Sequence, residues 1–478
     1  MTVPYTQAKR SDDRAPTPAA LQAAEADDLR KRAYYEAPQR VLIARRFSKH
    51  KVALWMAYVV ATLYLGCLNA NFFSPYDPNA VHRYSVNQPP QSLRFGRVPG
   101  FALPRFYVRP LVRRRDPVTL AERYTPDLDR RLPLRFGVRG YSWRFLWLFP
   151  TDRHFFGVDP EPVAGVAAAG QPVCRAMPAN ADMPRRIRLS VADAMESLPW
   201  RSGDIIRWSG AEELRSIARL DEEPGVVWLD ADAALPPDGE PCEIWRPHRA
   251  FLLGTGPLGQ DVLSRILHGG RISLLIGLMG VLLSFALGIT LGGISGYFGG
   301  RVDMIIQRTA EVLMTIPKIP IWLALAAAIP KQWSSLSVYF MMTLILASMG
   351  WTGLCRVVRG KLLALREEDY ARAALLAGAS ERRIIFVHLL PNFVSHLIAS
   401  LTLAIPGMIL AETSLSFLGL GLRPPIVSWG VLLQQAQSVE VVENQPWMLL
   451  PAVAVIVSVL AFNFVGEGLR DAADPYST

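Results

Sequence analysis

The sequence predicts an all-α polytopic membrane protein of six transmembrane helices, with a small β-rich or irregular extracytoplasmic domain between helices 1 and 2. Three observations lead to this class. Long apolar runs occur once before residue 72 and repeatedly after residue 270. Basic residues gather in the segments expected on the cytoplasmic side. The segment 72–250 between the first two runs contains no span.

Composition supports the class and excludes others. Only 19% of the 478 residues are charged, against about 25% in an average soluble domain. With 51% hydrophobic residues, this argues against a disordered chain and an ordinary cytosolic enzyme. A net charge of +10 fits nucleic acid, an anionic membrane surface or cytoplasmic loops. Four cysteines exclude a disulfide-dense scaffold.

The spans are read from apolar runs of roughly 20 residues. The first begins after fifty residues of charged chain, too late for a standard secretory signal, so we expect an anchored helix. The second is rich in glycine, which permits close helix approach in lipid. Pro317 and Pro320 should kink or break the third. The six spans are Val52–Leu68, Ile272–Leu291, Ile305–Ile329, Ser334–Cys355, Phe393–Leu418 and Trp447–Val465.

Orientation follows from Lys and Arg in short loops. The segment 1–51 holds 11 Lys and Arg against six Asp and Glu, and 356–392 holds seven against four. The segment 419–446 holds one Arg against two Glu. These counts place both termini in the cytoplasm. The expected organisation is a cytoplasmic tail (1–50), helix 1 (51–71), an extracytoplasmic insertion (72–250), a helical core (251–470) and a cytoplasmic tail (471–478).

The insertion 72–250 contains 25 Arg, no Lys and 22 Asp and Glu. Interleaved Arg and aromatic residues can bind single-stranded nucleic acid, but an extracytoplasmic location argues against it. We expect a solvated, salt-bridged surface with aromatic anchors; a docking surface or a lid over a pore is the alternative. Cys174 and Cys242 could form a disulfide in an oxidising compartment. His154 and His248 are isolated, so no metal site is expected.

Catalytic motifs are absent from the sequence. There is no phosphate-binding GxxxxGK[ST] loop, no GxSxG elbow and no HExxH pair. Ionisable residues within the spans are few, which argues against a proton relay. The chain is expected to form a path and to bind no cofactor itself.

The loop 356–392 is the most informative segment. Tyr370–Leu376 is expected to form a short helix that stops at Gly378. Ser380 should then cap a second helix that continues to Pro391. Two short helices in a basic cytoplasmic loop make a compact knob, whose small residues let another protein approach its backbone. On periodicity alone, an ordinary amphipathic connector fits equally well.

This loop resembles the coupling loop, or EAA motif, of permease subunits of ATP-binding-cassette importers. Ala373, Ala374, Gly378 and Pro391 fit the spacing of the family. Arg372 replaces the usual acidic residue before the alanines, and His388 stands where the general pattern has Ile.

Three further stretches resemble the C-type subunit of dipeptide and oligopeptide permeases. They are GTGPLGQDVLSRILHGGRISL (Gly254–Leu274), GYFGGRVDMIIQR (Gly296–Arg308) and ETSLSFLGLGLRPPIVSWG (Glu412–Gly430). Gly256 and Gln260 replace the usual Asp and Arg. The resemblance covers about residues 251–470, and the insertion lies outside the usual pattern.

The resemblance implies a type I importer permease fold and half of a translocation path for peptides. It implies a heterodimer with a homologous permease subunit, and two cytoplasmic ATPases that bind ATP and Mg. It also implies an extracytoplasmic solute-binding protein.

Glu412 could line the path, but a structural carboxylate is the preferred interpretation. Arg308 and Glu311, three residues apart, should pair on one helix face, and Asp261, Arg265 and Arg271 should organise the start of the second span.

Two alternatives remain open. The same fold could import nickel chelates or another small solute. The chain could instead be a membrane-anchored receptor or assembly factor that acts through its outer domain, although such a protein has no reason to keep an ATPase-coupling loop.

Overall fold

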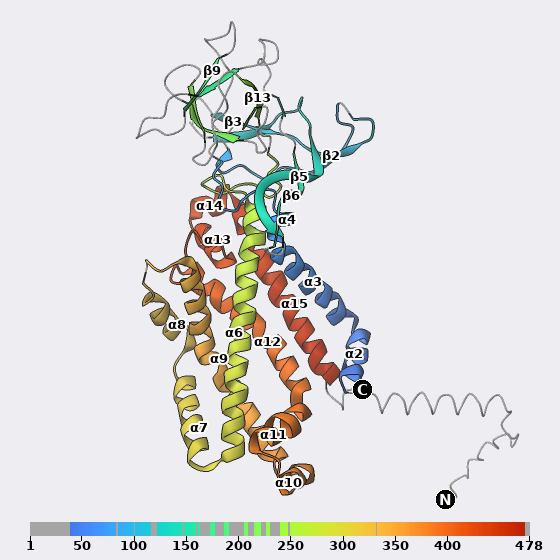
Figure 1. Ribbon diagram of the computed structural model, residues 1–478, viewed down its shortest axis with the longest axis vertical. Coiled ribbons are helices and arrows are strands. Elements are labelled where there is room, and N and C mark those ends of the chain that lie inside the picture. The colour runs from blue at the N-terminus through green and yellow to red at the C-terminus, as the bar shows by residue number, and fades with distance from the viewer. Residues whose placement is uncertain are drawn as a thin grey trace, which may run out of the picture.

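The structure is a computed structural model (Figure 1). It describes most of the chain outside residues 159–248, and within that region it describes the backbone of short strands. The described residues are 39–82, 85–99, 101–115, 122–145, 148–158, 161–162, 173–176, 186–190, 205–208, 215–220, 226–229, 240–246, 249–330 and 332–473.

Helices before and after the strands form one bundle. The longer helices are α2 (Gln39–Lys49), α3 (Lys51–Leu68), α6 (Val262–Phe298), α7 (Gly300–Thr315), α8 (Lys318–Ala327), α9 (Ser335–Leu365), α12 (Val394–Phe417) and α15 (Leu450–Ala473). The shorter elements are α4 (Ala70–Phe73), α10 (Asp369–Leu376), α11 (Glu381–Arg383), the π-helical turn η2 (Ile384–Leu389), the 3₁₀ turn η3 (Leu390–Phe393), α13 (Trp429–Gln435), α14 (Val439–Asn444) and the 3₁₀ turn η4 (Pro446–Leu449).

Five helical segments within the described residues are long and apolar enough to cross a membrane: α3, α6, α9, α12 and η4 with α15. A sixth span is obtained if α7 and α8 are counted together. These two helices meet at a bend of 87°, and Pro317 is the N-cap residue of α8. Proline has no N–H to donate to the preceding turn. The expected break in the third span is therefore confirmed.

The helix α6 lies at the centre of the bundle and packs against α9, α12 and α3, while α15 packs against α12 and α3 (Figure 1). Three glycines four residues apart on α6 face α9. A Cβ atom at Gly292 would lie 2.5 Å from the carbonyl oxygen of Cys355. At Gly288 and Gly296 it would lie 3.0 and 2.9 Å from carbonyl oxygens of α9. The predicted close approach through glycine is confirmed, because only hydrogen fits at these positions.

Strands occupy the region between α4 and α6. They are β1 (Arg94–Gly96), β2 (Arg105–Val108), β3 (Leu111–Arg115), β4 (Glu122–Pro126), β5 (Leu132–Phe145), β6 (Phe149–Val158), β7 (Glu161–Pro162), β8 (Val173–Ala176), β9 (Arg186–Ser190), β10 (Ile205–Trp208), β11 (Arg215–Leu220), β12 (Val226–Leu229) and β13 (Glu240–Arg246). The pairings between these strands are antiparallel.

Two sheets and a hairpin result. The first sheet has the order β1-β2-β5-β6, and β3 pairs with β4. The second sheet has the order β10-β11-β12-β9-β8-β13-β7, and β10 also pairs with β13. This extra pairing closes the six strands from β10 to β13 in that order into a ring. The facing edges of β10 and β13 are therefore paired with each other and not left free.

The described strands and α13 and α14 lie at one end of the bundle, and α10 and α11 lie at the other (Figure 1). The first sheet is attached to the bundle at its root. The backbone N–H of Thr255 donates to the carbonyl of Gln88 at 2.9 Å, and the backbone N–H of Gln88 donates to the hydroxyl of Thr255 at 2.8 Å. The Gln91 side chain accepts from the backbone N–H of Phe251 at 2.6 Å. An apolar cluster containing Val158 and Ala250 closes the root.

Candidate coupling surface and the polar clusters of the bundle

The predicted knob is built from α10, a glycine turn and α11, at the end of the bundle opposite the sheets (Figure 1). The side chain of Ala371 is buried, and Ala374 packs against the apolar core. Ala373 and Gly378 are exposed, as are Leu375 and Leu376 on the outer side of the helix. The knob is therefore anchored by one alanine face and presents its other face outward.

Gly378 ends α10 as expected. Its φ of +79° lies in the left-handed region that favours glycine. The N–H of Gly378 donates to the carbonyl of Leu375 at 3.0 Å, and the N–H of Ala379 donates to that of Ala374 at 3.1 Å. This pair of bonds is the Schellman arrangement, which satisfies the last carbonyl groups of the helix and fixes the turn.

The second helix of the knob differs from the prediction. Ser380 occupies the N-cap position of α11, but its side chain makes no capping hydrogen bond. The α-helix lasts only three residues and continues as the π turn η2 and the 3₁₀ turn η3. Pro391 lies at the start of η3. Because proline cannot donate a backbone hydrogen bond, a regular α-helix cannot run through this position, and the hydrogen-bond spacing changes before it.

Arg372 is held by a carboxylate of the preceding turn. Its guanidinium donates to Glu367 at 2.7 Å, and the other oxygen of Glu367 accepts from Arg366 at 3.1 Å. The hydrogen bond from Arg372, followed by that from Arg366, lowers the pKa of Glu367. Arg366 also donates to the carbonyl of Tyr297 at 3.2 Å. A pocket of about 340 Å³ adjoins these groups, and it is lined by Tyr297, Arg366, Glu367, Ala371, Arg372, Leu375 and Ile384.

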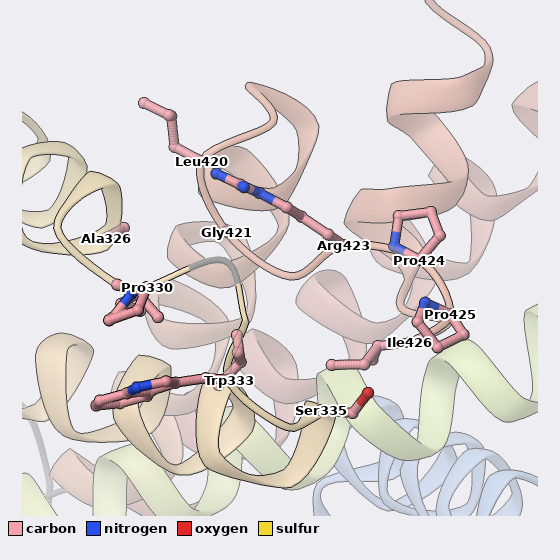
Figure 2. Close-up of a pocket in the computed structure, with 12 residues that line it drawn as sticks. Ala326, Pro330, Trp333, Ser335, Leu420, Gly421, Arg423, Pro424, Pro425 and Ile426 are labelled. Carbon is pink, nitrogen blue, oxygen red and sulfur yellow. The ribbon is translucent and has the colours of Figure 1, made fainter.

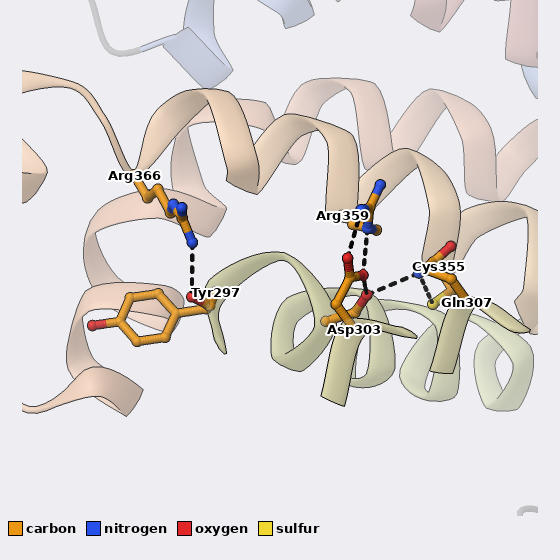
Figure 3. Close-up of polar contacts among 7 residues, drawn as sticks. Tyr297, Asp303, Gln307, Cys355, Arg359 and Arg366 are labelled. Atoms are coloured by element: carbon orange, nitrogen blue, oxygen red, sulfur yellow. Dashed lines mark hydrogen bonds and ion pairs between the residues drawn. The ribbon is translucent and has the colours of Figure 1, made fainter. Parts of the chain in front are cut away.

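Behind the knob, a polar cluster joins α6, α7 and α9 (Figure 3). Arg359 of α9 donates to both carboxylate oxygens of Asp303 in α7, one of them at 2.6 Å. Ser295 of α6 also donates to Asp303, and Gln307 donates to the Ser295 hydroxyl at 2.8 Å. No local pattern pairs Asp303 with Arg359, because 56 positions separate them in the sequence.

Glu412 lies in the interior of the bundle, with no exposed surface. Its two carboxylate oxygens accept from the hydroxyl groups of Ser273 at 2.8 Å and Ser416 at 2.9 Å. Ser273 in turn accepts from the backbone N–H of Trp429 at 3.2 Å. The cluster joins α12 to α6 and to the start of α13. A structural carboxylate of this kind was expected at a helix end or interface, bonded to backbone or to the partner subunit, whereas Glu412 is buried and bonded to hydroxyl groups of α6 and α12. A place on the path stays a prediction.

The other charged residues singled out from the sequence have structural partners. Arg308 and Glu311 form the expected pair at 3.3 Å. Asp261 is the N-cap residue of α6 and accepts from the backbone N–H of Ser264 at 2.8 Å. Arg265 donates to Gln435 of α13 at 2.8 Å, and Arg271 donates to the carbonyls of Cys67 and Leu68 at the end of α3.

The predicted disulfide falls on strands that are described by their backbone alone. Cys174 lies in β8 opposite Glu240 of β13, two residues from Cys242 in the same strand. The two cysteines are thus on neighbouring strands, and the bond between them stays a prediction. Among the described residues, no group of three His, Cys, Asp or Glu side chains is arranged to hold a metal ion.

A second pocket, of about 150 Å³, was not anticipated from the sequence (Figure 2). It lies between the link from α8 to α9 and the link from α12 to α13. Trp333 lies on one side of it, and Arg423, Pro424 and Pro425 lie on the other (Figure 2). Arg423 is the one charged residue of the twelve that line it. The motif around Arg423 was noted only for its resemblance, because nothing local indicates that Trp333 lies opposite.

Comparisons with known proteins match both parts of the bundle. Residues 288–476 match the family model described as binding-protein-dependent transport system inner membrane component. Residues 39–90 match the N-terminal TM domain of oligopeptide transport permease C. The two matched stretches lie on either side of residues 91–287.

Curated relatives agree with these models. The oligopeptide transport system permease protein OppC of Haemophilus influenzae is 39% identical over 223 residues, which cover 46% of this chain and 69% of that protein. A putative peptide permease protein of Brucella suis is 42% identical, with coverage of 46% and 72%. The dipeptide transport system permease protein DppC of Bacillus subtilis is 39% identical, with coverage of 48% and 70%. The chain belongs to the family of inner membrane components of binding-protein-dependent transport systems, and its first helix belongs to the oligopeptide permease C type.

Proposed function

We propose that this chain forms half of the translocation path of an ATP-driven peptide importer. Its membership of the family makes it a multi-pass membrane subunit of a binding-protein-dependent system. The peptide cargo is inferred from relatives named as oligopeptide and dipeptide permeases. The observation that carries the proposal is the knob of α10, Gly378 and α11, an exposed surface braced against the bundle by Ala371 and Ala374.

The knob is suited to transmit force from a partner. Its glycine turn is fixed by two backbone hydrogen bonds, and the ion pair of Arg359 with Asp303 ties the preceding helix to α7. We propose that one of two cytoplasmic ATPase subunits, which bind ATP and Mg, docks on this surface. Closure of the ATPases would then move the knob as a rigid body, and the helix bundle would switch between its two openings. Pro391 and Ala373 would line the edge of the contact.

The topology of the proposal follows from the same placement. With the knob in the cytoplasm, residues 1–50 and 471–478 are cytoplasmic and residues 72–250 are extracytoplasmic. The path is completed by a homologous permease subunit, and an external solute-binding protein delivers the peptide. A receptor or assembly factor acting through its outer domain would have no use for the knob.

The test uses Gly378 in the assembled complex. Gly378→Trp puts a large side chain at an exposed turn. A Cβ atom built on Gly378 has no atom within 4 Å apart from those of its chain neighbours. Gly378→Asn is the matched control, because Asn tolerates the left-handed backbone with a small side chain. We expect the Trp variant to insert normally but lose peptide-stimulated ATPase activity and uptake, and the Asn variant to keep most of both. Unchanged peptide-stimulated ATPase activity in the Trp variant would contradict the assignment of the knob as the ATPase-docking surface.

The cargo is tested separately. The cognate solute-binding protein should bind peptides in a titration against a panel of peptides and nickel chelates. If only the chelates bind, the chain is still a subunit of an importer, but the peptide is contradicted as its substrate and a nickel chelate takes its place.

A further inference from the structure

The end of the β5–β6 hairpin carries large apolar side chains that no other described part of the chain covers. Phe145 pairs with Phe149 across the hairpin. Leu148 and Phe149 are 74% and 63% exposed. A water-facing hairpin normally ends in polar turn residues, so this end is built for an apolar environment.

These side chains continue a row of rings that starts at the end of the first membrane helix. The ring of Phe72 in α4 lies 6.5 Å from that of Trp143 and 5.8 Å from that of Phe155. The ring of Phe73 lies 5.4 Å from that of Phe155. Figure 1 shows β5 and β6 curving from the sheet down to α4. The hairpin therefore reaches the level at which α3 leaves the membrane.

The hairpin is fixed in this position by His154. Its ring is buried, and Nδ1 lies 2.8 Å from the carbonyl oxygen of Asn71 and 2.9 Å from that of Ser74, at the end of α4. Nε2 lies 3.0 Å from the carbonyl oxygen of Tyr141 in β5. The ring packs so closely that a Cβ atom at Gly140 would lie 2.6 Å from it. The hairpin and the membrane helix are thus held together as one unit.

The helix beside the hairpin leaves most of its surface uncovered by the described part of the chain. Only 11% of the span α3 is buried within the chain, and Trp55, Tyr58 and Leu65 are exposed along it. Aromatic residues are favoured where a membrane protein crosses the boundary between lipid and water. The row of rings on the hairpin extends this exposed apolar surface sideways from the end of the helix.

Exposed arginines accompany the rings. Arg144 and Arg153 are exposed on the hairpin, and Arg139 is paired with Asp152 at 3.7 Å. The Trp143 indole N–H donates to the carbonyl of Arg153 at 3.1 Å. Arginine and aromatic rings side by side suit the boundary region, because the guanidinium contacts lipid phosphate while the rings contact the upper acyl chains.

We propose that the end of the β5–β6 hairpin, together with α4, is an interfacial anchor that lies in the phospholipid headgroup region around α3. Trp143, Phe145 and Phe149 would contact the upper acyl chains, and Arg144 and Arg153 would contact phosphate oxygens. The anchor holds the first sheet at a fixed height and angle above the bundle. It is independent of what the protein transports.

The test places a photo-crosslinking amino acid, benzoylphenylalanine, at Phe149 of the full chain within its complex. The complex is reconstituted into vesicles of phosphatidylcholine and phosphatidylglycerol. Phe95 is the matched control: it is also a phenylalanine of the first sheet, is 64% exposed, and lies in β1 at the opposite edge of that sheet. After irradiation, the adducts at each position are identified by mass spectrometry.

We expect lipid adducts at position 149 with a yield several-fold above that at position 95. Equal yields at the two positions, or adducts at 149 only with another subunit, would overturn the proposal, and the second result would identify a protein contact instead. If substitution of Phe149 prevents assembly, Leu148 carries the same probe. A further variant, Arg144→Glu with Arg153→Glu, should shift the adducts away from phosphatidylglycerol, the lipid with a net negative headgroup. An unchanged ratio of the two lipids would exclude a role of these arginines in attracting anionic headgroups.

Discussion

Two carboxyl groups of the bundle, the buried Glu412 and the half-buried Asp303, have hydroxyl or guanidinium groups as partners. Glu412 accepts from Ser273 and Ser416 and has no exposed surface. Asp303 accepts from Arg359 and Ser295. A buried carboxylate without such partners would cost several kcal/mol, so each cluster fixes which helices meet around it.

His82 provides a test of acid sensitivity at the root of the insertion. Its ring is 7% exposed, lies 5.5 Å from the ring of Tyr76 and 5.4 Å from that of Phe251, and has a buried Nε2 without a partner. Burial, and then the charge of Arg249, lower the pKa of His82 from 6.5 to about 3. Because the folded state disfavours the protonated ring, its stability is fully present above pH 6.5 and is lost as the pH falls towards 3.

His82→Phe keeps the ring packing and removes this titration. We measure hydrogen exchange of the segment 74–93 and correct it for the intrinsic exchange rate at each pH. We expect the opening free energy so obtained to fall between pH 7 and pH 5 in the native chain and much less in the variant. Asp261 acts in the opposite sense, since burial raises its pKa to about 6 and its contribution is lost as the pH rises. The comparison of the two proteins at each pH cancels that effect. Equal acid sensitivity in both would show that His82 does not titrate in this range.

At the scale of elements, the contact of α6 with α9 depends on the glycine row of α6. Apolar burial gives little attraction between helices in lipid, so close packing and polar contacts must hold them together. Gly288, Gly292 and Gly296 let the two backbones touch, and Arg359 with Asp303 lies at the inner end of the same contact. The knob follows directly after α9, so the position of α9 sets the position of the knob.

Gly292→Leu should separate these helices. The new Cβ would meet the carbonyl oxygen of Cys355 at 2.5 Å, and overpacking of this kind costs about 1–3 kcal/mol or more. We expect a lower thermal midpoint in detergent and loss of transport. Gly353→Leu in α9 is the control, because nothing lies within 4 Å of its Cβ position, and it should behave as the native chain. Normal stability of the Gly292 variant would mean that α9 does not approach α6 as described.

At the scale of the whole molecule, α6 connects the two functional ends. Its 37 residues span about 55 Å at 1.5 Å per residue, well above the ~30 Å of the hydrocarbon core. One end contacts α13 through Arg265 and Gln435, and the other contacts α7 through Ser295 and α9 through Gly296. A displacement of the knob can therefore reach the end that carries the sheets along one continuous helix.

Removal of the outer part of the insertion tests its role in docking. Our expectation from the sequence is that loss of about residues 90–240 weakens docking of the solute-binding protein or assembly of the complex. The structure gives a gentler deletion. Val158 and Ala250 lie in one apolar cluster, so residues 159–248 can be replaced by a short glycine linker that leaves β1–β6 in place. We expect normal membrane insertion with reduced docking or assembly; native uptake by the shortened chain would show that this part is dispensable.

Local patterns determined much of this fold. Apolar runs located the spans, Pro317 and Pro320 located the break between α7 and α8, and the glycines of α6 indicated a close helix contact. The span of α6 was nevertheless predicted as Ile272–Leu291 and is much longer. Hydropathy marks only the part of a helix that lies in lipid, whereas the Asp261 cap and the turn at Gly299, with φ of +66°, set its ends.

Contacts between residues distant in sequence were decided by the tertiary structure. Glu412 meets Ser273 across 139 positions, and Arg359 meets Asp303 across 56. His154 meets Asn71 across 83. No local pattern encodes these meetings, because they require the helices and strands to be packed first. The sequence by itself indicated which segments are long and apolar enough to cross a membrane and which family they resemble. The packed chain decided what each buried polar side chain touches and where the β5–β6 hairpin meets α4, because these contacts exist only once the elements are packed.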